Sequence, residues 1–296
     1  MRILAVIPAY NEQRTIAEVV LKAEKYVDEV VVVDDGSSDL TGEIARRMGA
    51  TVLRHETNRG KGAALRTGFL HALRSGADVV VTLDADGQHD PDEIPRLIEP
   101  IIKGGADVVV GSRYLGTSQG IPLYRRVGLA LINALGRLVS GAPVSDTQSG
   151  FRAYSRRALS VVVRAQEEGY AAELEHLTLA SGSGLKIVEV PVSIRYSGLV
   201  RTSKANPLIH AAELVNSLIY ALIYRRPLLY LGLPGTLLLV CGVALGFEVV
   251  RIYFRMRVLA LGYALISVTM VILGWLLIST SLTIFIIKET IRGARR

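Results

Sequence analysis

Cysteine is almost absent from this chain of 296 residues, and its single cysteine, Cys241, lies within an apolar run. This excludes an internal disulfide and gives no support to a zinc site or a cysteine nucleophile. A secretory signal is also missing, because the apolar run Ile3–Ile7 is short, ends at Pro8, and is followed at once by Asn11 and Glu12. We therefore expect Ile3–Ile7 to form a buried strand and the soluble part to remain in the cytoplasm.

Charge is scarce in the last quarter of the chain and abundant before it. Half of all residues are hydrophobic, and the formal net charge is +7. The hydrophobic share is high for a purely soluble protein and predicts some surface that faces lipid. A basic balance permits nucleic acid, anionic lipid or phosphorylated small molecules as partners, and charge alone does not choose among them.

Short β-branched runs alternate with amphipathic segments in the first half. The expected strands are Ile3–Ile7, Val30–Val33, Thr51–Arg54, Val79–Leu83 and Val108–Val110. The expected helices are Thr15–Lys25, Thr41–Met48, Ala63–Ser75 and Pro91–Lys103. Strands that are apolar throughout and separated by helices predict an α/β domain with a mostly parallel, Rossmann-like sheet covered on both faces. Further along we expect a helix at Ile121–Leu138, a loop entering a strand at Asp146–Ser155, and two late strands, Leu185–Val190 and Val192–Tyr196.

Polar residues follow four of these strands. They are Tyr10-Asn11-Glu12, Asp34-Asp35-Gly36, Asp84-Ala85-Asp86 and Ser112-Arg113. In doubly wound sheets ligands bind beyond the carboxyl ends of the strands, so these residues are expected to meet in one site.

The acid-x-acid triplet is the centre of this predicted site. Asp84 and Asp86 flank Ala85 at a strand end, and Gln88 follows. Oxygen ligands of this kind suit Mg²⁺ or Mn²⁺. Such an ion could neutralise the charge that develops on a diphosphate leaving group.

Two glycine-containing segments have simpler interpretations. Asn58–Gly62 lacks the spacing of both the dinucleotide fingerprint and the P-loop, so it predicts a tight turn with backbone amides near the ligand. Asp34–Ser37 begins a turn in which Ser38 or Asp39 could cap the next helix. Two adjacent carboxylates exceed what a cap requires, and one could accept hydrogen bonds from a base or ribose.

The C-terminal quarter predicts membrane attachment. Pro207–Tyr224 has apolar residues at helical spacing and is interpreted as a helix on the membrane surface, with a core helix as the alternative. Leu228–Phe247 and Tyr263–Ile287 are uncharged and long enough to cross a bilayer. Three arginines are expected in the loop between them, and the larger positive charge outside the pair favours a cytoplasmic location for both ends.

Six motifs occur in order along the soluble part. They are Pro8-Ala9-Tyr10-Asn11-Glu12, Asp34-Asp35-Gly36-Ser37, Asn58-Arg59-Gly60-Lys61-Gly62, Asp84-Ala85-Asp86-Gly87-Gln88, Gly111-Ser112-Arg113 and Ser149-Gly150-Phe151-Arg152. In this order they resemble the family 2 inverting glycosyltransferases, specifically the dolichyl-phosphate sugar synthase branch. The resemblance implies a GT-A fold for the catalytic part.

The resemblance also implies roles for individual residues. It assigns nucleotide-sugar binding to Pro8, Ala9, Tyr10, Glu12, Val33, Asp35, Asp84, Ala85, Arg113, Arg201 and Lys204. It assigns the metal, Mg²⁺ or Mn²⁺, to Asp86 and Gln88. It assigns the acceptor phosphate to Arg113, Arg125, Arg126 and Ser149. The residues expected to carry catalysis are Asp86, Arg113 and Lys204. The polar, basic loop Ser197–Lys204 is interpreted as a mobile lid, and the lid arginine is Arg195 or Arg201.

The predicted reaction is an inverting transfer of a sugar from a nucleotide-sugar (UDP-glucose, UDP-GlcNAc or GDP-mannose) to dolichyl or another polyprenyl phosphate. The acceptor phosphate is already anionic, so no general base is required, and Glu173 and Glu175 are interpreted as structural or sugar-contacting. The expected partners are the donor, the lipid phosphate and the membrane, with no nucleic acid; a homo-oligomer is left open. Undecaprenyl phosphate as acceptor, a nucleotidyltransferase and a membrane-tethered sugar-nucleotide binder are the alternatives.

We expect three parts: a catalytic domain at residues 1–205, an interfacial helix at 206–227, and a transmembrane hairpin with a basic tail at 228–296. The protein is expected to be a multi-pass membrane protein with its catalytic domain in the cytoplasm.

Overall fold

The computed structural model describes residues 1–115, 133–166, 172–193, 223 and 226–294. The chain divides into two compact units, Met1–Val215 and Asn216–Arg296. Each unit is described by itself, and the three-part division expected from the sequence stays a prediction.

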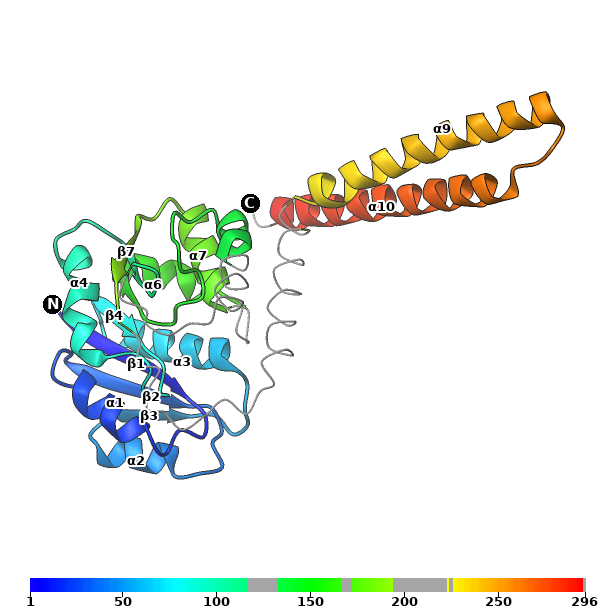
Figure 1. Cartoon of the computed structure of the whole chain (residues 1–296). Helices are drawn as coiled ribbons and strands as arrows, with labels where there is room; N and C mark the ends of the chain where they lie inside the picture. Colours follow the sequence, from blue (N-terminus) through cyan, green and yellow to red (C-terminus); the bar gives the residue numbers. More distant parts are fainter. Residues whose placement is uncertain (116–132, 167–171, 194–222, 224–225, 295–296) are drawn as a thin grey trace. The chain divides into compact units, whose positions relative to one another are not determined.

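The first unit is built on a seven-stranded sheet with the order β3-β2-β1-β4-β6-β5-β7. The strands are β1 Ile3–Ala9, β2 Glu29–Asp34, β3 Thr51–Arg54, β4 Val79–Thr82, β5 Val108–Ser112, β6 Arg152–Ser155 and β7 Ile187–Pro191. All neighbouring strands run parallel except β6, which is antiparallel to β4 and β5 on its two sides. The carboxyl ends of β1, β2, β4 and β5 therefore point to one edge of the sheet, as the sequence predicts (Figure 1).

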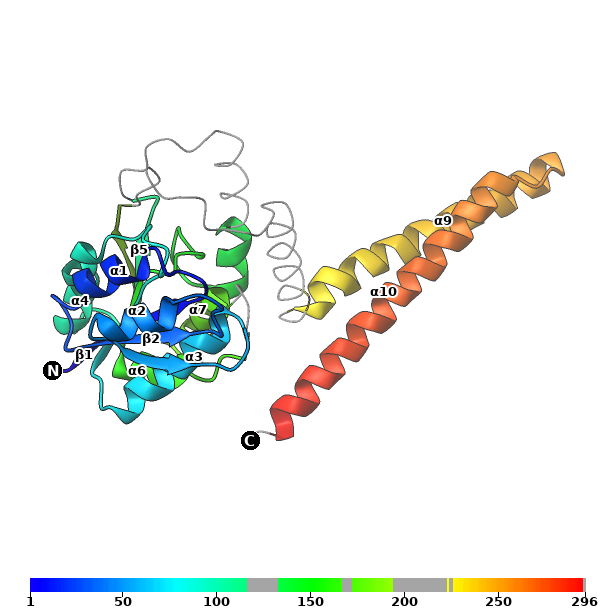
Figure 2. The ribbon, with the colours of Figure 1, turned by 90° about the horizontal axis from the view of Figure 1, so that it is seen from below.

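Helices cover both faces of this sheet (Figures 1 and 2). They are α1 Ile16–Ala23, α2 Thr41–Arg47, α3 Lys61–Arg74, the short 3₁₀ turn η1 Pro91–Glu93 with α4 Ile94–Ile102, α6 Arg156–Val162 and α7 Ala172–Gly182. Alternate residues of β1 show the division: Ala5 and Ile7 join a core cluster with α1, α2 and α4. Leu4 and Val6 join a second cluster with α3, α6 and α7. Apolar residues on both sides of the central strands thus bury both faces of the sheet there, while the edge strands β3 and β7 are only partly buried.

Helix α3 lies unusually close to the central strand. A Cβ atom on Gly68 would come within 2.3 Å of Val6 Cγ1. Glycine at this position allows α3 to pack tightly against β1, which fixes where the N-terminus of α3 meets the site edge of the sheet.

The predicted fold class is confirmed, and so are the five early strands and four early helices, with ends shifted by a few residues. The late part differs. Pro191 ends β7, where its missing N–H is tolerated because β7 is an edge strand. Of the strand predicted at Val192–Tyr196, residues 194–196 lie outside the described residues. Val192 and Ser193 form no strand, and α6 and α7 were not expected.

Several expected elements lie outside the described residues. Of the helix predicted at Ile121–Leu138, only residues 133–138 are described, and they are helical. The basic loop Ser197–Lys204 and, apart from Ile223, the surface helix Pro207–Tyr224 lie outside them.

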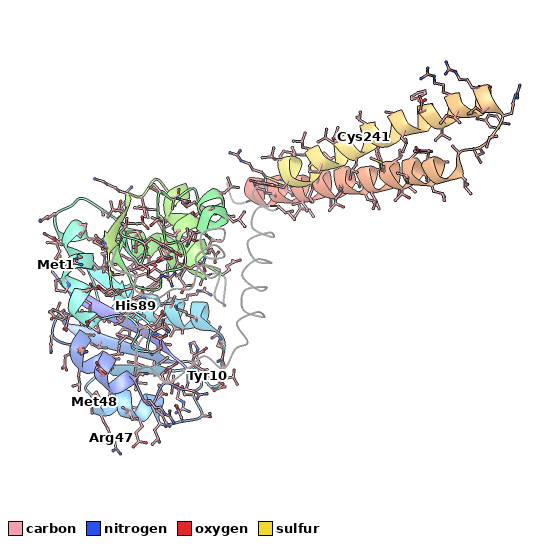
Figure 3. All side chains as sticks on the ribbon, viewed as in Figure 1. Met1, Tyr10, Arg47, Met48, His89 and Cys241 are labelled. Atoms are coloured by element: carbon pink, nitrogen blue, oxygen red, sulfur yellow. The ribbon has the colours of Figure 1, made fainter. Side chains whose placement is uncertain are left out.

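The second unit contains two long apolar helices. A single π-helical turn, η2 Leu228–Gly232, leads into α9 Leu233–Met256, and α10 Leu261–Ala294 follows. By length and composition both could cross a membrane, and they could form a transmembrane hairpin. Figure 3 shows Cys241 on α9, where it is exposed.

Small residues bring these helices together. A Cβ atom on Gly274 would come within 2.6 Å of the Leu239 backbone nitrogen, and Ser267 Oγ donates a hydrogen bond of 2.8 Å to the Gly242 carbonyl. Close packing through small residues and hydroxyl bonds is how helices associate in lipid.

The expected arginine loop is shorter than predicted. Arg251 and Arg255 lie in the last two turns of α9, and Arg257 alone of the three lies in the connection, with a left-handed backbone. Apolar residues continue in α9 after Glu248, the first charged residue beyond the uncharged stretch. The helix therefore extends past the end that the uncharged stretch predicted.

Candidate active site

The first site segment follows β1 and is held by hydrogen bonds to the segment after β2. Pro8 and Ala9 lie within β1, beside Val33 and Asp34 of β2. Asn11 has φ 57°, and its side chain accepts a hydrogen bond from the Ser38 amide at 2.9 Å. These contacts fix the loop at the site edge, and Tyr10 is left 46% exposed (Figure 3).

The two aspartates at the end of β2, Asp34 within the strand and Asp35 just after it, are both buried and both hydrogen-bonded by the protein. Asp34 accepts a hydrogen bond from the Ser37 amide at 2.9 Å. Asp35 accepts hydrogen bonds from the amides of Arg59 and Gly60 at 3.0 and 2.8 Å. It also contacts His55 Nδ1 at 2.6 Å. The amides of the glycine turn are thus directed at Asp35, whereas the sequence had suggested that they face the ligand.

Carboxyl groups crowd the edge beyond β1 and β4. Burial raises the pKa of Asp86 to about 6, and the nearby Asp84 charge adds to this. Burial also raises the pKa of Glu12 to about 7, although its contact with Thr15 opposes the shift and Asp86 reinforces it. Both acids therefore keep their protons to a higher pH than exposed carboxyl groups do, chiefly because burial disfavours the charged form.

These residues fit a divalent cation. Asp86 offers a carboxylate and Gln88 a side-chain amide oxygen. The backbone N–H of Gln88 donates a hydrogen bond of 3.0 Å to Asp86 Oδ1, which holds the two residues in one turn. Carboxylate and amide oxygens suit Mg²⁺ or Mn²⁺. Within the described residues no cluster of three or more His, Cys, Asp or Glu side chains could hold an ion alone. A cation here would need further oxygen ligands from water or substrate.

Lys61 is a site residue that the sequence reasoning missed. It is the first residue of α3, and its ammonium lies 2.5 Å from Asp84 Oδ1 and 2.7 Å from Glu173 Oε1. Burial alone would raise the pKa of Asp84, but the Lys61 charge outweighs it and holds the pKa below its usual value. Asp84 is therefore ionised and paired. The signal for Lys61 was its place in the third motif, where attention went to the glycines.

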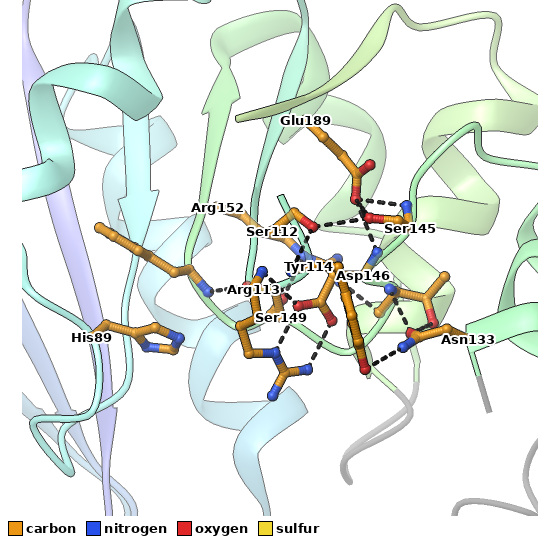
Figure 4. Close-up of polar contacts among 12 residues, drawn as sticks. His89, Ser112, Arg113, Tyr114, Asn133, Ser145, Asp146, Ser149, Arg152 and Glu189 are labelled. Carbon is orange, nitrogen blue, oxygen red and sulfur yellow. Dashed lines mark hydrogen bonds and ion pairs between the residues drawn. The ribbon is translucent and has the colours of Figure 1, made fainter. Parts of the chain in front are cut away.

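Arg113 lies just beyond β5 and forms an ion pair with a buried aspartate (Figure 4). Its Nε and one terminal nitrogen donate to the two oxygens of Asp146 at 2.6 and 2.7 Å. Asp146 is fully buried, while the Arg113 side chain remains 22% exposed. This forked pairing fixes the plane of the guanidinium. Asp146 is a second residue that the sequence did not single out.

The Asp146 loop is in turn anchored by β7 and by residue 133. Glu189 accepts hydrogen bonds from the amides of Ser145 and Asp146 at 2.6 and 2.9 Å (Figure 4). Asn133 accepts from the Thr147 amide at 2.9 Å. The loop that carries Asp146, and so orients Arg113, is thus held by hydrogen bonds to Glu189 on one side and to Asn133 on the other.

Ser149, predicted to bind acceptor phosphate, is buried at the start of the sixth motif. Its Oγ accepts a hydrogen bond from the Phe151 amide at 3.3 Å, and its carbonyl accepts from Arg152 at 2.7 Å. Arg152 is fully buried and also donates to the carbonyls of Thr147 and Glu173. It ties this loop to the start of α7.

The structure brings together the described members of the predicted site at the edge of the sheet. Five residues with predicted site roles lie outside the described part of the chain and stay predictions: Arg125, Arg126, Arg195, Arg201 and Lys204. Glu175 accepts a hydrogen bond from the Gln166 amide at 2.9 Å, a local contact.

Comparison with known protein families matches residues 4–163 to the family described as "Glycosyl transferase family 2". The chain belongs to this family. The predicted family, the GT-A-like fold and the enzyme class are therefore confirmed, and the protein is a glycosyltransferase. Family membership and intact acidic residues remove the nucleotidyltransferase and the non-catalytic binder as alternatives.

Named relatives and solved structures are similar over most of this glycosyltransferase. A UDP-N-acetylglucosamine–dolichyl-phosphate N-acetylglucosaminyltransferase of Methanococcus voltae is 35% identical, over 70% of this chain and 91% of its own. A dolichyl-phosphate hexose transferase of Haloferax volcanii is 34% identical, over 75% and 94%. Glucosyl-3-phosphoglycerate synthase of Mycobacterium tuberculosis, solved with Mg²⁺ and UDP, has a TM-score of 0.57 and 28% identity, covering 76% and 79%.

Proposed function

We propose that this glycosyltransferase moves a sugar from a nucleotide-sugar to a polyprenyl phosphate such as dolichyl phosphate, at the cytoplasmic face of a membrane and with a divalent metal. The observation that carries the proposal is the pairing of opposite charges at one sheet edge. Asp86 and Gln88 offer oxygen ligands for a cation, and Arg113, held by Asp146, offers a fixed cation for phosphate.

Two further observations support the lipid acceptor. The relatives from Methanococcus voltae and Haloferax volcanii are named for dolichyl phosphate. The second unit of this chain provides two helices that could span a bilayer. A polyprenyl tail stays in the bilayer, so an enzyme acting on its phosphate needs such an anchor.

The residues divide the work of the proposed reaction. A bound Mg²⁺ or Mn²⁺ would be held by Asp86 and Gln88 and would offset the charge on the donor diphosphate. Arg113 would bind phosphate with a guanidinium whose plane is already set, which reduces the cost of positioning. Glu173 is already paired with Lys61, which agrees with a reaction in which the anionic acceptor attacks without a general base.

The remaining predicted contacts belong to this proposal. Arg125, Arg126 and Ser149 would hold the acceptor phosphate, and Arg201 and Lys204 would close on the donor. Pro8, Tyr10, Glu12, Val33 and Asp35 would surround the nucleoside.

Product analysis tests the proposal. Detergent-solubilised full-length protein is incubated with Mn²⁺, a panel of UDP- and GDP-sugars, and either dolichyl or undecaprenyl phosphate, and lipids are identified by mass spectrometry. We expect one sugar–phosphate–lipid product, with the acceptor arms deciding the polyprenyl class. Asp86→Ala should reduce product formation at least about a hundredfold, because a cation ligand is lost.

The matched control is Asp92→Asn. Asp92 is exposed on η1, and its carboxylate accepts a hydrogen bond from the Tyr26 hydroxyl at 3.0 Å, so its loss should leave product formation unchanged. A wild-type protein that forms no glycolipid with any donor and either lipid would refute the proposed function.

A further inference from the structure

Lys61, Asp84 and Glu173 form a three-charge cluster that connects three separate elements. Lys61 begins α3, Asp84 follows β4, and Glu173 lies in the first turn of α7. The Lys61 ammonium bridges the other two, at 2.5 Å from Asp84 Oδ1 and 2.7 Å from Glu173 Oε1. The side chain of Glu173 is 5% exposed and that of Lys61 is 20% exposed, so water screens these charges only weakly.

A glycine leaves the room that the cluster needs. A Cβ atom on Gly150 would lie 2.8 Å from both Asp84 Oδ2 and Lys61 Nζ. Any larger residue would therefore push directly into the ion pair. The backbone of the sixth motif, Ser149–Arg152, thus forms a wall of the same cluster.

The cluster separates two aspartates that lie two residues apart. Asp86 is the carboxylate available to a cation, and its Oδ1 accepts a hydrogen bond from the backbone N–H of Gln88. Asp84 has its Oδ1 committed to Lys61, and its Oδ2 lies 3.7 Å from Nδ1 of the buried His89. Lys61 is therefore the charged partner that fixes the orientation of Asp84, while Asp84 Oδ2 faces the buried His89 ring.

The charge balance explains why a lysine is required here. Asp84, Asp86, Glu12 and Glu173 bring four carboxyl groups to one region. Burial would lower the pKa of Lys61, yet Asp84 and then Glu173 raise it above its usual value, so the lysine stays charged. Removing it would take away the ion pair that holds Asp84 Oδ1 and leave Asp84 free to rotate towards the cation ligands.

We propose that Lys61 is a positioning residue for the donor: anchored by Glu173, it holds Asp84 in a fixed orientation as an acceptor for the donor nucleotide-sugar and apart from the cation ligands Asp86 and Gln88. This inference rests on the proposed function. Lys61 acts through Asp84 and does not touch the reacting atoms.

The test compares donor and acceptor kinetics in purified full-length protein, using the donor that the product assay identifies. Lys61→Met removes the charge with little change in volume. It should raise the donor KM about tenfold or more, the size expected for one charge-assisted hydrogen bond, and change the acceptor KM less than about twofold. A purely structural role would not select the donor.

A double mutant separates positioning from simple loss of a charge. If Lys61 acts through Asp84, the variant Lys61→Met/Asp84→Asn should have a donor KM no higher than Asp84→Asn alone. Glu173→Gln keeps the volume and an acceptor oxygen, so it should raise the donor KM less than Lys61→Met does. It also gives a measurement if Lys61→Met fails to fold.

Lys103→Met is the matched control, since it removes a lysine whose partner, Glu99, is on the exposed surface of α4. Its donor KM should equal that of the wild type. The inference is overturned if Lys61→Met and Glu173→Gln both leave the donor KM within about twofold of wild type, or if the Lys61 and Asp84 effects multiply. A wild type without any glycolipid product would instead refute the proposed function.

Discussion

Removing Arg113 should reduce stability as well as activity, and the two losses can be separated. Asp146 is fully buried, and Arg113 donates to both of its oxygens at 2.6 and 2.7 Å. Arg113→Ala leaves this carboxylate buried without its charged partner. Breaking a buried pair from one side costs about 3–5 kcal/mol. Because the Arg113 side chain is 22% exposed, we expect the lower end, about 3 kcal/mol.

A second substitution, Asp146→Asn, removes the negative charge that Arg113→Ala leaves buried and unpaired. In Arg113→Ala/Asp146→Asn the residue at 146 is neutral, so we expect about half of the lost unfolding free energy to return, about 1–2 kcal/mol. Glycolipid formation should not return, because the guanidinium proposed to bind phosphate is still missing. Stability and activity would then diverge in the double variant.

Pulse proteolysis in urea measures these free energies on the full-length protein in detergent, and product formation is assayed in parallel. Arg157→Ala is the control, since Arg157 makes a surface pair with Asp107 at 3.7 Å that should contribute less than about 1 kcal/mol. The reasoning fails if Arg113→Ala is as stable as wild type within about 0.5 kcal/mol, or if the double variant is no more stable than the single.

Three further predictions concern pH and close packing. Because burial raises the pKa of Glu12 to about 7 from 4.5, its protonated form stabilises the fold below about pH 4.5, and this contribution is lost as the pH rises through 7. Metal-free wild type should therefore lose on the order of 1 kcal/mol of unfolding free energy between pH 5 and 8 by pulse proteolysis, and Glu12→Gln should flatten this slope; an unchanged slope contradicts the assignment. Gly68→Ala should destabilise the first unit by about 1–3 kcal/mol in the same assay, because its Cβ would come within 2.3 Å of Val6 Cγ1 and α3 would have to move. Gly274→Leu should separate α9 from α10, seen as faster proteolysis of the hairpin in detergent, whereas Gly262→Ala, with nothing within 4 Å of its Cβ, should not; equal cleavage would show that the glycine contact is dispensable.

The sheet and the acidic edge could be predicted because their signals are local. Continuous apolar runs such as Val79–Leu83 mark buried parallel strands, and acidic residues directly after such a run must lie at its carboxyl end. The strand Arg152–Ser155 has no apolar run, so its reversed direction between β4 and β5 could not be read from its composition. Pro191 has a strong local signal for a break between strands, but it is tolerated within β7 because it is the last residue of an edge strand.

The partners of the site residues could not be predicted, because they are chosen by contacts between distant segments. Nothing near Arg113 in the sequence indicates Asp146, which reaches it only after β6 and its preceding loop return to the sheet. Glu173 reaches Lys61 in the same way, from the first turn of a helix that had not been predicted.

The dependence of site residues on partners from distant segments has a functional consequence. In the proposed reaction the motif residue Arg113 would bind a phosphate, but the orientation of its guanidinium is set by Asp146, which lies outside the motifs. A side chain that must present one fixed charge has to be held by a buried counter-charge, since a solvated one would rotate freely. Variation at supporting residues such as Asp146 should therefore impair this enzyme nearly as much as variation in the motifs themselves.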